Sequence, residues 1–163
     1  MITGVEVKGH GFEDLMKRIK DGIETKLMVG VPEKNAARGD EGKQKVNNAQ
    51  LAFIHTYGSP VNNIPARPFL VPAITQTETM DRISELFKQG FEAAIEGGEE
   101  SATPYLEKAG IVAVNAVNDY IQDSSHFVPN APETIRRKGS DKPLIDTASL
   151  KRSITYVIKR GDE

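Results

Sequence analysis

The chain has three histidines, and their spacing decides whether it can hold a metal ion. His10, His55 and His126 lie far apart in the sequence, and none belongs to an HxH or HExxH pattern that would place two ligands on one face. The chain has no Cys, which excludes disulfides, thiolate-bound zinc, iron–sulfur clusters and thiol nucleophiles. We therefore predict no metal site. We expect His55 to be a half-buried helix residue and His126 a loop residue after Ser125.

Acidic pairs are the next candidates for chemistry. Asp40–Glu41 and Glu99–Glu100 both lie in segments that look solvated, whereas general acid–base catalysis needs carboxylates held at a set distance, often with one desolvated. We expect these pairs to be hydrated loop charges. The chain also lacks the GxGxxG, GxxxxGK[ST] and GxSxG motifs. We predict no catalytic residue, no cofactor and no enzymatic activity; an enzyme assembled from distant positions stays an alternative, and perturbed carboxylates in a pocket would reveal it.

The C-terminal quarter differs in charge from the rest of the chain. Residues 126–163 hold eight basic and five acidic side chains, a net charge of +3; since the whole chain carries −2, the first 125 residues carry −5. This quarter is therefore the predicted surface for an anionic partner, with ordinary solvated charge as the alternative. Few aromatic residues lie nearby, so the contact would be to phosphates rather than to stacked bases. A small DNA-binding module is accordingly our second hypothesis for function.

Length and composition favour one domain over residues 1–163. The chain is 38% hydrophobic and 27% charged, and a domain of this size buries enough surface to fold without a disulfide or a metal. No apolar run is long enough to cross a membrane, and the mean hydropathy is −0.41. The first twenty residues lack the apolar region of a signal peptide. We expect no membrane contact and a cytoplasmic protein.

Hydrophobic periodicity predicts the elements of the first half. Alternation predicts strands at 3–8 and 26–32, and a spacing of three and four residues from Phe12 to Ile19 predicts a helix between them. Residues 33–48 contain almost nothing to bury, which predicts a mobile, charged, exposed loop. A short helix follows and ends at Gly58, Ser59 and Pro60. The two prolines of VNNIPARPFL make the next stretch a rigid, non-helical connector.

Two long helices dominate the predicted second half. An apolar stripe from Met80 ends at Gly97, and after a break at GGEES a second stripe predicts a helix of about five turns. Residues 126–152 are predicted to be irregular, with one helical turn at Thr134–Arg137 and a helix cap at Asp146 or Thr147. A strand at 153–160 ends the chain. The predicted class is α+β, a small, mostly antiparallel sheet packed against two long helices and shorter helices.

Two stretches carry a resemblance to a known family. LAFIHTYGSPVNNIPARPFLVPAI at 51–74 contains IHxxG followed by IPARPFL, and residues 128–158 contain PN, T, KG, PLIDT, L and SI in order. Together they resemble the neck and tail-completion proteins of tailed bacteriophages, also called virion morphogenesis or head–tail joining proteins. The motifs cover about a third of the chain. Thr56 and Ala148 depart from the family pattern, in which an acidic residue and a glycine are usual.

The resemblance implies a structural virion protein that forms a homo-oligomeric ring, expected to be a hexamer, at the head–tail junction. Such a ring terminates or completes the tail and joins it to the neck or connector. The implied partners are further copies of the chain, the tail tube protein and the neck or connector proteins, with DNA in the lumen as a further candidate and no small-molecule substrate. The implied location is the virion, and the host cytoplasm during assembly. Tail terminator and connector-side ring stay alternatives, as do contractile and non-contractile tails.

Candidate interface residues follow from the rigid connector and from the basic quarter. A Pro-locked segment presents Arg67 and Phe69 at a fixed angle, and Arg and aromatic residues are enriched among interface hot spots. A core position is the alternative for Phe69. The basic quarter adds Arg136, Arg137, Lys138, Lys151 and Arg152. The loop at 33–48 is a further hypothetical contact with a neighbouring subunit.

Overall fold

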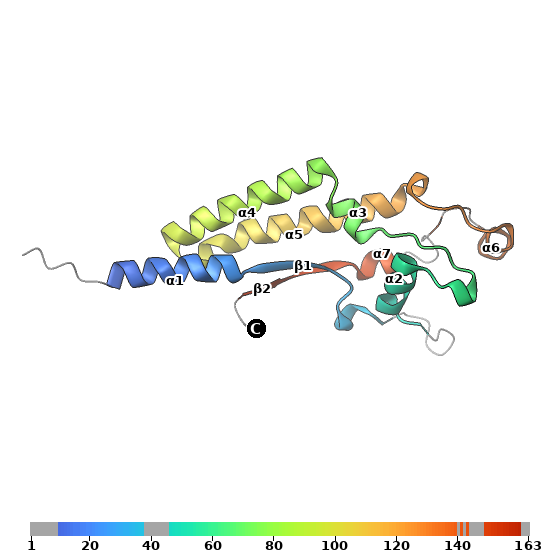
Figure 1. Cartoon of the computed structure of the whole chain (residues 1–163), viewed down its shortest axis with the longest axis horizontal. Coiled ribbons are helices and arrows are strands. Elements are labelled where there is room, and N and C mark those ends of the chain that lie inside the picture. Colours follow the sequence, from blue (N-terminus) through green and yellow to red (C-terminus); the bar gives the residue numbers. More distant parts are fainter. Residues whose placement is uncertain (1–9, 38–45, 140, 142, 144–148, 161–163) are drawn as a thin grey trace, which may run out of the picture.

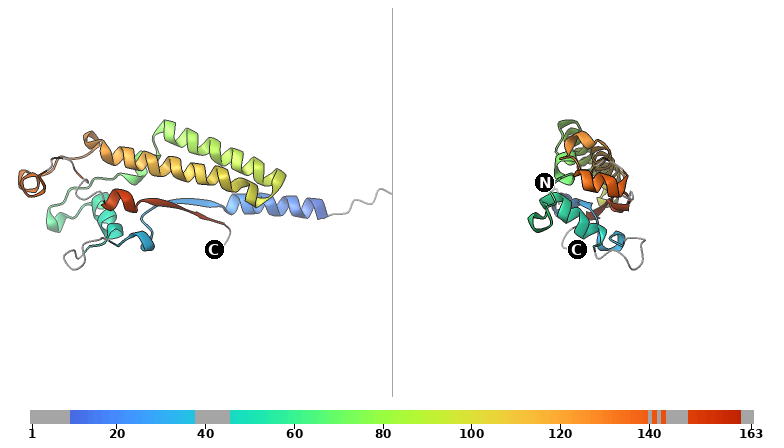
Figure 2. Two further views of the ribbon diagram at one scale, coloured as in Figure 1. Left: turned by 180° about the vertical axis from the view of Figure 1, so that it is seen from behind. Right: turned by 90° about the vertical axis from the view of Figure 1, so that its right-hand side faces the viewer.

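A computed structural model describes residues 10–37, 46–139, 141, 143 and 149–160. The described part of the chain is elongated, with α1 (His10–Glu24) at one end and α6 (Pro132–Lys138) at the other (Figure 1). The long helices form one layer and a two-stranded sheet forms a second, as the view from behind also shows (Figure 2). Among the described residues, no helix combines the length and the apolar character needed to cross a bilayer.

The central layer is a hairpin of α4 (Thr77–Gly97) and α5 (Glu99–Gln122). Only Gly98, with a φ of +89°, separates the two helices, so the break predicted at GGEES is present but is only one residue long. The acidic residues of that stretch form the first turn of α5, where carboxylates interact favourably with the helix dipole. The second helix is therefore longer than predicted, at 24 residues, and it contains Pro104 in its second turn.

The sheet consists of β1 (Lys26–Gly30) and β2 (Thr155–Lys159), which pair antiparallel with Leu27 opposite Ile158 and Val29 opposite Tyr156. These two pairs share one face, and that face packs against α5, where a Cβ at Gly110 would overlap the Tyr156 ring. The α+β class, with a small antiparallel sheet against two long helices, is confirmed. The strand predicted at 3–8 lies outside the described residues.

Helix α1 leads directly into β1 and packs against α4 with its C-terminal half. There a Cβ at Gly22 would lie 2.8 Å from the Phe91 ring, and Arg18 donates from Nη1 to the Ile95 carbonyl oxygen at 3.0 Å. The N-terminal half of α1 extends past the ends of α4 and α5 (Figures 1 and 2). The helix predicted around Phe12–Ile19 is thus present and continues to Glu24.

Short elements gather at the other end of the hairpin. Helix α2 (Asn48–Tyr57) begins with a capping box, in which Asn47 Oδ1 accepts from the Gln50 N–H at 2.8 Å and Gln50 Oε1 accepts from the Asn47 N–H at 3.0 Å. The other short elements are η1 (Glu33–Asn35), η2 (Pro60–Asn62), α3 (Leu70–Ile74), η3 (Ser124–His126), α6 and α7 (Ser149–Ser153).

Two segments contain more structure than their composition predicts. The predicted exposed loop at 33–48 includes η1 and two buried residues, Ala36 and Asn48. Asn48 can be buried because its side chain donates to Ser149 Oγ at 3.2 Å and its N–H donates to the Ala36 carbonyl at 2.8 Å. Within 126–152, the predicted turn at Thr134–Arg137 is part of α6, and α7 begins at Ser149. Residues 38–45 and the predicted caps Asp146 and Thr147 lie outside the described residues.

Candidate functional site

The two stretches that carry the family resemblance meet in one hydrophobic core. Ala52, Phe69 and Ala73 from the first stretch pack with Leu150 and Ile154 from the second. Val117 and Ile121 of helix α5 and Phe127 also belong to this cluster. Residues that are far apart in the sequence therefore form a single structural unit, which includes the Pro-rich connector.

Arg67 joins these two stretches through hydrogen bonds. Its Nε donates to the Val128 carbonyl oxygen at 2.8 Å and its Nη2 donates to the Pro129 carbonyl oxygen at 3.0 Å. Its backbone N–H donates to the His55 carbonyl oxygen at 2.6 Å. The residue is only 7% exposed, and burial lowers the pKa of its guanidinium. We expected the Arg67 side chain to be exposed for contact with a partner. Instead it is buried, because its guanidinium donates hydrogen bonds to the chain's own backbone carbonyls.

Phe69 is fully buried, at 0% exposure, and it precedes α3 as the N-cap residue. The core position, which was the alternative, is the observed one, and the prediction of an interface side chain is corrected. Burial alternates along the connector: Arg67 and Phe69 are buried, whereas Ala66 and Pro68 are exposed.

Gly58 is the C-cap residue of α2, at the position where the sequence predicts the helix to end. It has a φ of +75°, and a Cβ there would lie 2.8 Å from the Ile64 carbonyl oxygen and 2.9 Å from the Ala66 nitrogen. The next residue, Ser59, forms an isolated antiparallel bridge with Ile64. Glycine is therefore required by both the backbone angle and the close approach of the connector.

The basic residues of the C-terminal quarter lie on separate elements. Arg136 on α6 is exposed and pairs with Glu133 at 2.5 Å. Lys151 on α7 donates to Gln122 Oε1 at 2.9 Å, and Arg152 next to it is exposed. Arg137 and Lys138 belong to α6, but their side chains lie outside the described residues. The described basic side chains thus do not gather at one place on the surface.

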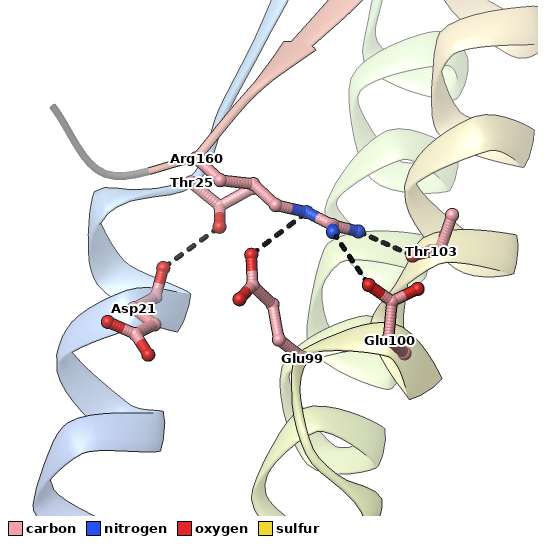
Figure 3. Close-up of polar contacts among 6 residues, drawn as sticks. All are labelled: Asp21, Thr25, Glu99, Glu100, Thr103 and Arg160. Atoms are coloured by element: carbon pink, nitrogen blue, oxygen red, sulfur yellow. Dashed lines mark hydrogen bonds and ion pairs between the residues drawn. The ribbon is translucent and has the colours of Figure 1, made fainter. Parts of the chain in front are cut away.

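Arg160, at the end of β2, interacts with the first turns of α5 (Figure 3). Its Nε lies 3.1 Å from Glu99 Oε1, its Nη1 lies 3.5 Å from Glu100 Oε1, and its Nη2 donates to Thr103 Oγ1. The pair Glu99–Glu100 was predicted to be loop charge; it belongs to a helix and neutralises part of the basic quarter. Asp40–Glu41 lie outside the described residues.

His126 ends η3 and stacks on Tyr120, with ring centroids 4.0 Å apart and planes 5° apart. Its Nε2 lies 3.3 Å from Asp123 Oδ2. Hydrogen bonds from Ser125 lower the pKa of the Asp123 carboxyl, and the charge of His126 lowers it further. His55 is half-buried on α2, as predicted. Among the described residues, no group of three or more His, Asp or Glu side chains is placed to hold a metal ion.

A groove of about 650 Å³ lies between α4 and α5 and contains side chains of both signs. Arg82 and Lys108 line it together with Glu78, Asp119 and Asp123. The mixture of charges favours no single class of charged ligand. Of the predicted interface residues whose side chains the structure describes, none lines this groove.

Two exposed apolar surfaces were missed by the sequence analysis. The first, called here the α1 stripe, consists of Phe12, Met16 and Ile23, which are 70%, 50% and 72% exposed. The second, called the α2 groove, has a volume of about 320 Å³ between α2 and the residues around Phe69. Its rim is formed by Phe53, Tyr57 and Val71, which are 64%, 68% and 68% exposed. The periodicity of Phe12, Met16 and Ile19 was visible in the sequence and predicted a helix, but it does not indicate which apolar residues stay exposed.

No protein-family model, curated protein or solved structure matches this chain significantly.

Proposed function

We propose that the chain is a structural virion protein that forms a ring at the head–tail junction of a tailed bacteriophage. It acts as a homo-oligomer, expected to be a hexamer, in contact with the tail tube and with the neck or connector. The observation that carries this proposal is the shared core of the two family-like stretches, which are joined by Phe69 and by the hydrogen bonds of Arg67 to Val128 and Pro129. Motifs that act as one structural unit support the resemblance better than separate matches would.

The uncovered apolar surfaces give this proposal independent support. Contiguous exposed apolar side chains, rimmed by polar ones, are typical of surfaces that bind other proteins. The α1 stripe and the α2 groove differ in shape and lie on different elements. Two unlike faces per subunit are what a ring with head-to-tail contacts requires.

The experiment is a measurement of assembly on the purified full-length chain. Its mass is measured by light scattering with and without tail tubes polymerised from the tube protein of the same phage genome, and tube tips are imaged by negative-stain electron microscopy. Closed rings, alone or at tube tips, are the expected result. A monomer that leaves the tubes uncapped would contradict the proposal.

DNA binding is the competing function, and the same preparation tests it. The described basic residues are divided between α6, α7 and β2, and Arg136 and Arg160 already pair with carboxylates. We therefore expect weak retention on heparin at physiological salt. Strong retention with a steep salt dependence would favour the DNA-binding module.

A further inference from the structure

The α1 stripe has the form of a helix that docks into an apolar groove. The apolar residues of α1, which are Phe12, Leu15, Met16, Ile19 and Ile23, follow the spacing i, i+3, i+4, i+7 and i+11. Ile19 and Leu15 lie toward the side of α1 that holds Gly22 and Arg18 against α4, whereas Phe12, Met16 and Ile23 form the exposed line. Helices that bind apolar grooves use anchors at this spacing.

The α2 groove has the complementary form. Its floor contains Ala52 and Phe69, and Phe53 and Tyr57 stand on the rim with ring centroids 4.7 Å apart. The ten residues of α2 include no acidic side chain and no basic one other than His55. An apolar helix face can therefore approach without burying a charge opposite the rim of α2.

The stripe and the groove of one molecule cannot meet. Helix α1 lies at one end of the elongated molecule, and α2 lies toward the other end, beyond the sheet (Figures 1 and 2). The C-terminal half of α1 is held against α4 by Gly22 and by Arg18. Each surface is therefore open to another molecule, and a second copy of the chain offers the complementary surface to both.

We propose that the α1 stripe of one copy docks into the α2 groove of the next copy. The proposal that the ring closes depends on the proposed function. The contact between two copies is inferred from the α1 stripe and the α2 groove alone. Because the stripe and the groove are different surfaces, the contact is heterologous and propagates from copy to copy.

The area of the two surfaces indicates how strong this contact is. The stripe and the rim of the groove have three exposed side chains each, and each side chain exposes roughly 100–150 Å² of surface. The contact therefore buries on the order of 800 Å² in total. Stable specific interfaces start at about 1,200 Å². One contact is therefore weak, and a stable assembly needs each copy to use both surfaces, as in a closed ring. Isolated subunits at low concentration should be monomeric.

Cysteine cross-linking tests the contact, since the natural chain contains no Cys. The double variant Met16→Cys/Val71→Cys is treated with a short bis-maleimide at a concentration where the wild type associates. We expect a ladder of covalent dimers, trimers and larger species. The control pair Met16→Cys/Ile111→Cys places the second thiol at a similarly exposed position on α5, outside the α2 groove, and should give about tenfold less product.

Single variants distinguish a head-to-tail contact from a symmetric one. Met16→Cys alone and Val71→Cys alone should remain uncross-linked. Covalent dimers of Met16→Cys alone would show that two α1 stripes pair with each other, and equal ladders in the test and control pairs would show non-specific contact. Either result overturns the proposal.

Acidic variants give a second readout that does not depend on thiol geometry. Phe12→Asp and Phe53→Asp change exposed residues, so both should fold, which circular dichroism verifies. Each alone should weaken self-association at least about tenfold in sedimentation velocity. Mixed at a concentration well above that at which the wild type associates, they retain one intact stripe and one intact groove, and they should form weak heterodimers and nothing larger. A mixture that stays monomeric contradicts the contact.

The two proposals fail in different ways. Capped tubes or rings without the Met16–Val71 ladder would leave the junction function standing and remove the docking contact. A specific ladder from a chain that ignores tail tubes and forms no closed ring would keep the contact and remove the function.

Discussion

Arg67 and Phe69 are two residues apart in the Pro-rich connector, and both side chains are buried in the chain's own fold. Arg67 bonds to two carbonyl oxygens and Phe69 fills the core. Both residues hold the connector in place beside the α2 groove, where Pro68 and Val71 are among the lining residues.

Replacing Arg67 tests this positioning role. Arg67→Leu removes both donors and leaves the Val128 and Pro129 carbonyls without them, so we expect the free energy of unfolding to fall by about 2–4 kcal/mol. Urea unfolding followed by circular dichroism measures it. Arg82→Leu, at an exposed position of α4, is the control and should change stability by less than about 0.5 kcal/mol. Equal stability of the two variants would contradict the assignment.

The Asp123 carboxyl makes a pH-dependent contribution to stability. Hydrogen bonds from Ser125 lower its pKa in the folded state, while an unfolded Asp titrates near about 3.9. The stabilisation is therefore fully present above that pH and is lost as the pH falls through the folded pKa. The stability difference between wild type and Asp123→Asn should stay constant down to about pH 5 and shrink as the pH falls from about 4 toward 2. Asp81→Asn, on the exposed side of α4, is the control, and a difference that is constant with pH would refute the expectation.

At the scale of elements, α5 organises the molecule. It packs against α4 on one side and against the sheet on another, and it contributes Val117 and Ile121 to the core that joins the family-like stretches. Small residues at its contacts, such as Ala109, Gly110 and Ala113, allow the neighbouring elements to approach closely. Helix α1, in contrast, packs against the rest of the molecule with only part of its length, and the α1 stripe is therefore exposed.

Glycine-to-alanine substitutions on two helices should have opposite effects. A Cβ at Gly110 would overlap the Tyr156 ring, so Gly110→Ala should lower the free energy of unfolding by about 1–3 kcal/mol despite its better helix propensity. Gly11 in α1 has open space around it, so Gly11→Ala should be neutral or should stabilise by up to about 1 kcal/mol. Thermal unfolding compares the two, and a stabilised Gly110→Ala would show that α5 and β2 are not packed as described.

At the scale of the whole molecule, the elongated shape separates the two apolar surfaces (Figure 1). A subunit with unlike surfaces at opposite ends adds to its neighbour in one direction, and the rotation between subunits decides whether a ring closes. This arrangement is consistent with the proposed ring. The contacts between subunits would then not depend on the basic residues of α6 and α7.

Salt dependence distinguishes apolar assembly from phosphate or ionic contacts. Because the stripe and the rim of the groove are apolar, self-association should change less than about threefold between 0.1 and 0.5 M NaCl. Assembly driven by the basic residues of α6 and α7 would weaken steeply over the same range. Sedimentation velocity at both salt concentrations measures the effect, with Lys151→Gln/Arg152→Gln as a control variant that should assemble like the wild type.

Local patterns in the sequence were sufficient for most of the elements and for the α+β class. The stripe from Met80 to Phe91 is found on α4, the alternation from Leu27 to Val29 on β1, and Gly58 at the end of α2. Each of these features depends on neighbours within a few residues, through helical or strand periodicity or through a backbone angle that glycine permits. The helix starts at Glu99 and Ser149 were harder to predict, because polar residues and a proline obscure the apolar period.

Only the tertiary structure decided which surfaces are covered. Arg67 bonds to backbone carbonyls, a group present in every residue, so nothing in its sequence neighbourhood identifies its partners. The contact of Arg160 with Glu99 joins residues far apart in the chain. Phe12 and Phe87 lie in similar amphipathic helical patterns, yet the first is exposed and the second packs against a core cluster. Periodicity determines which face of a helix is apolar, whereas the packing of distant elements determines whether that face is buried or left for another molecule.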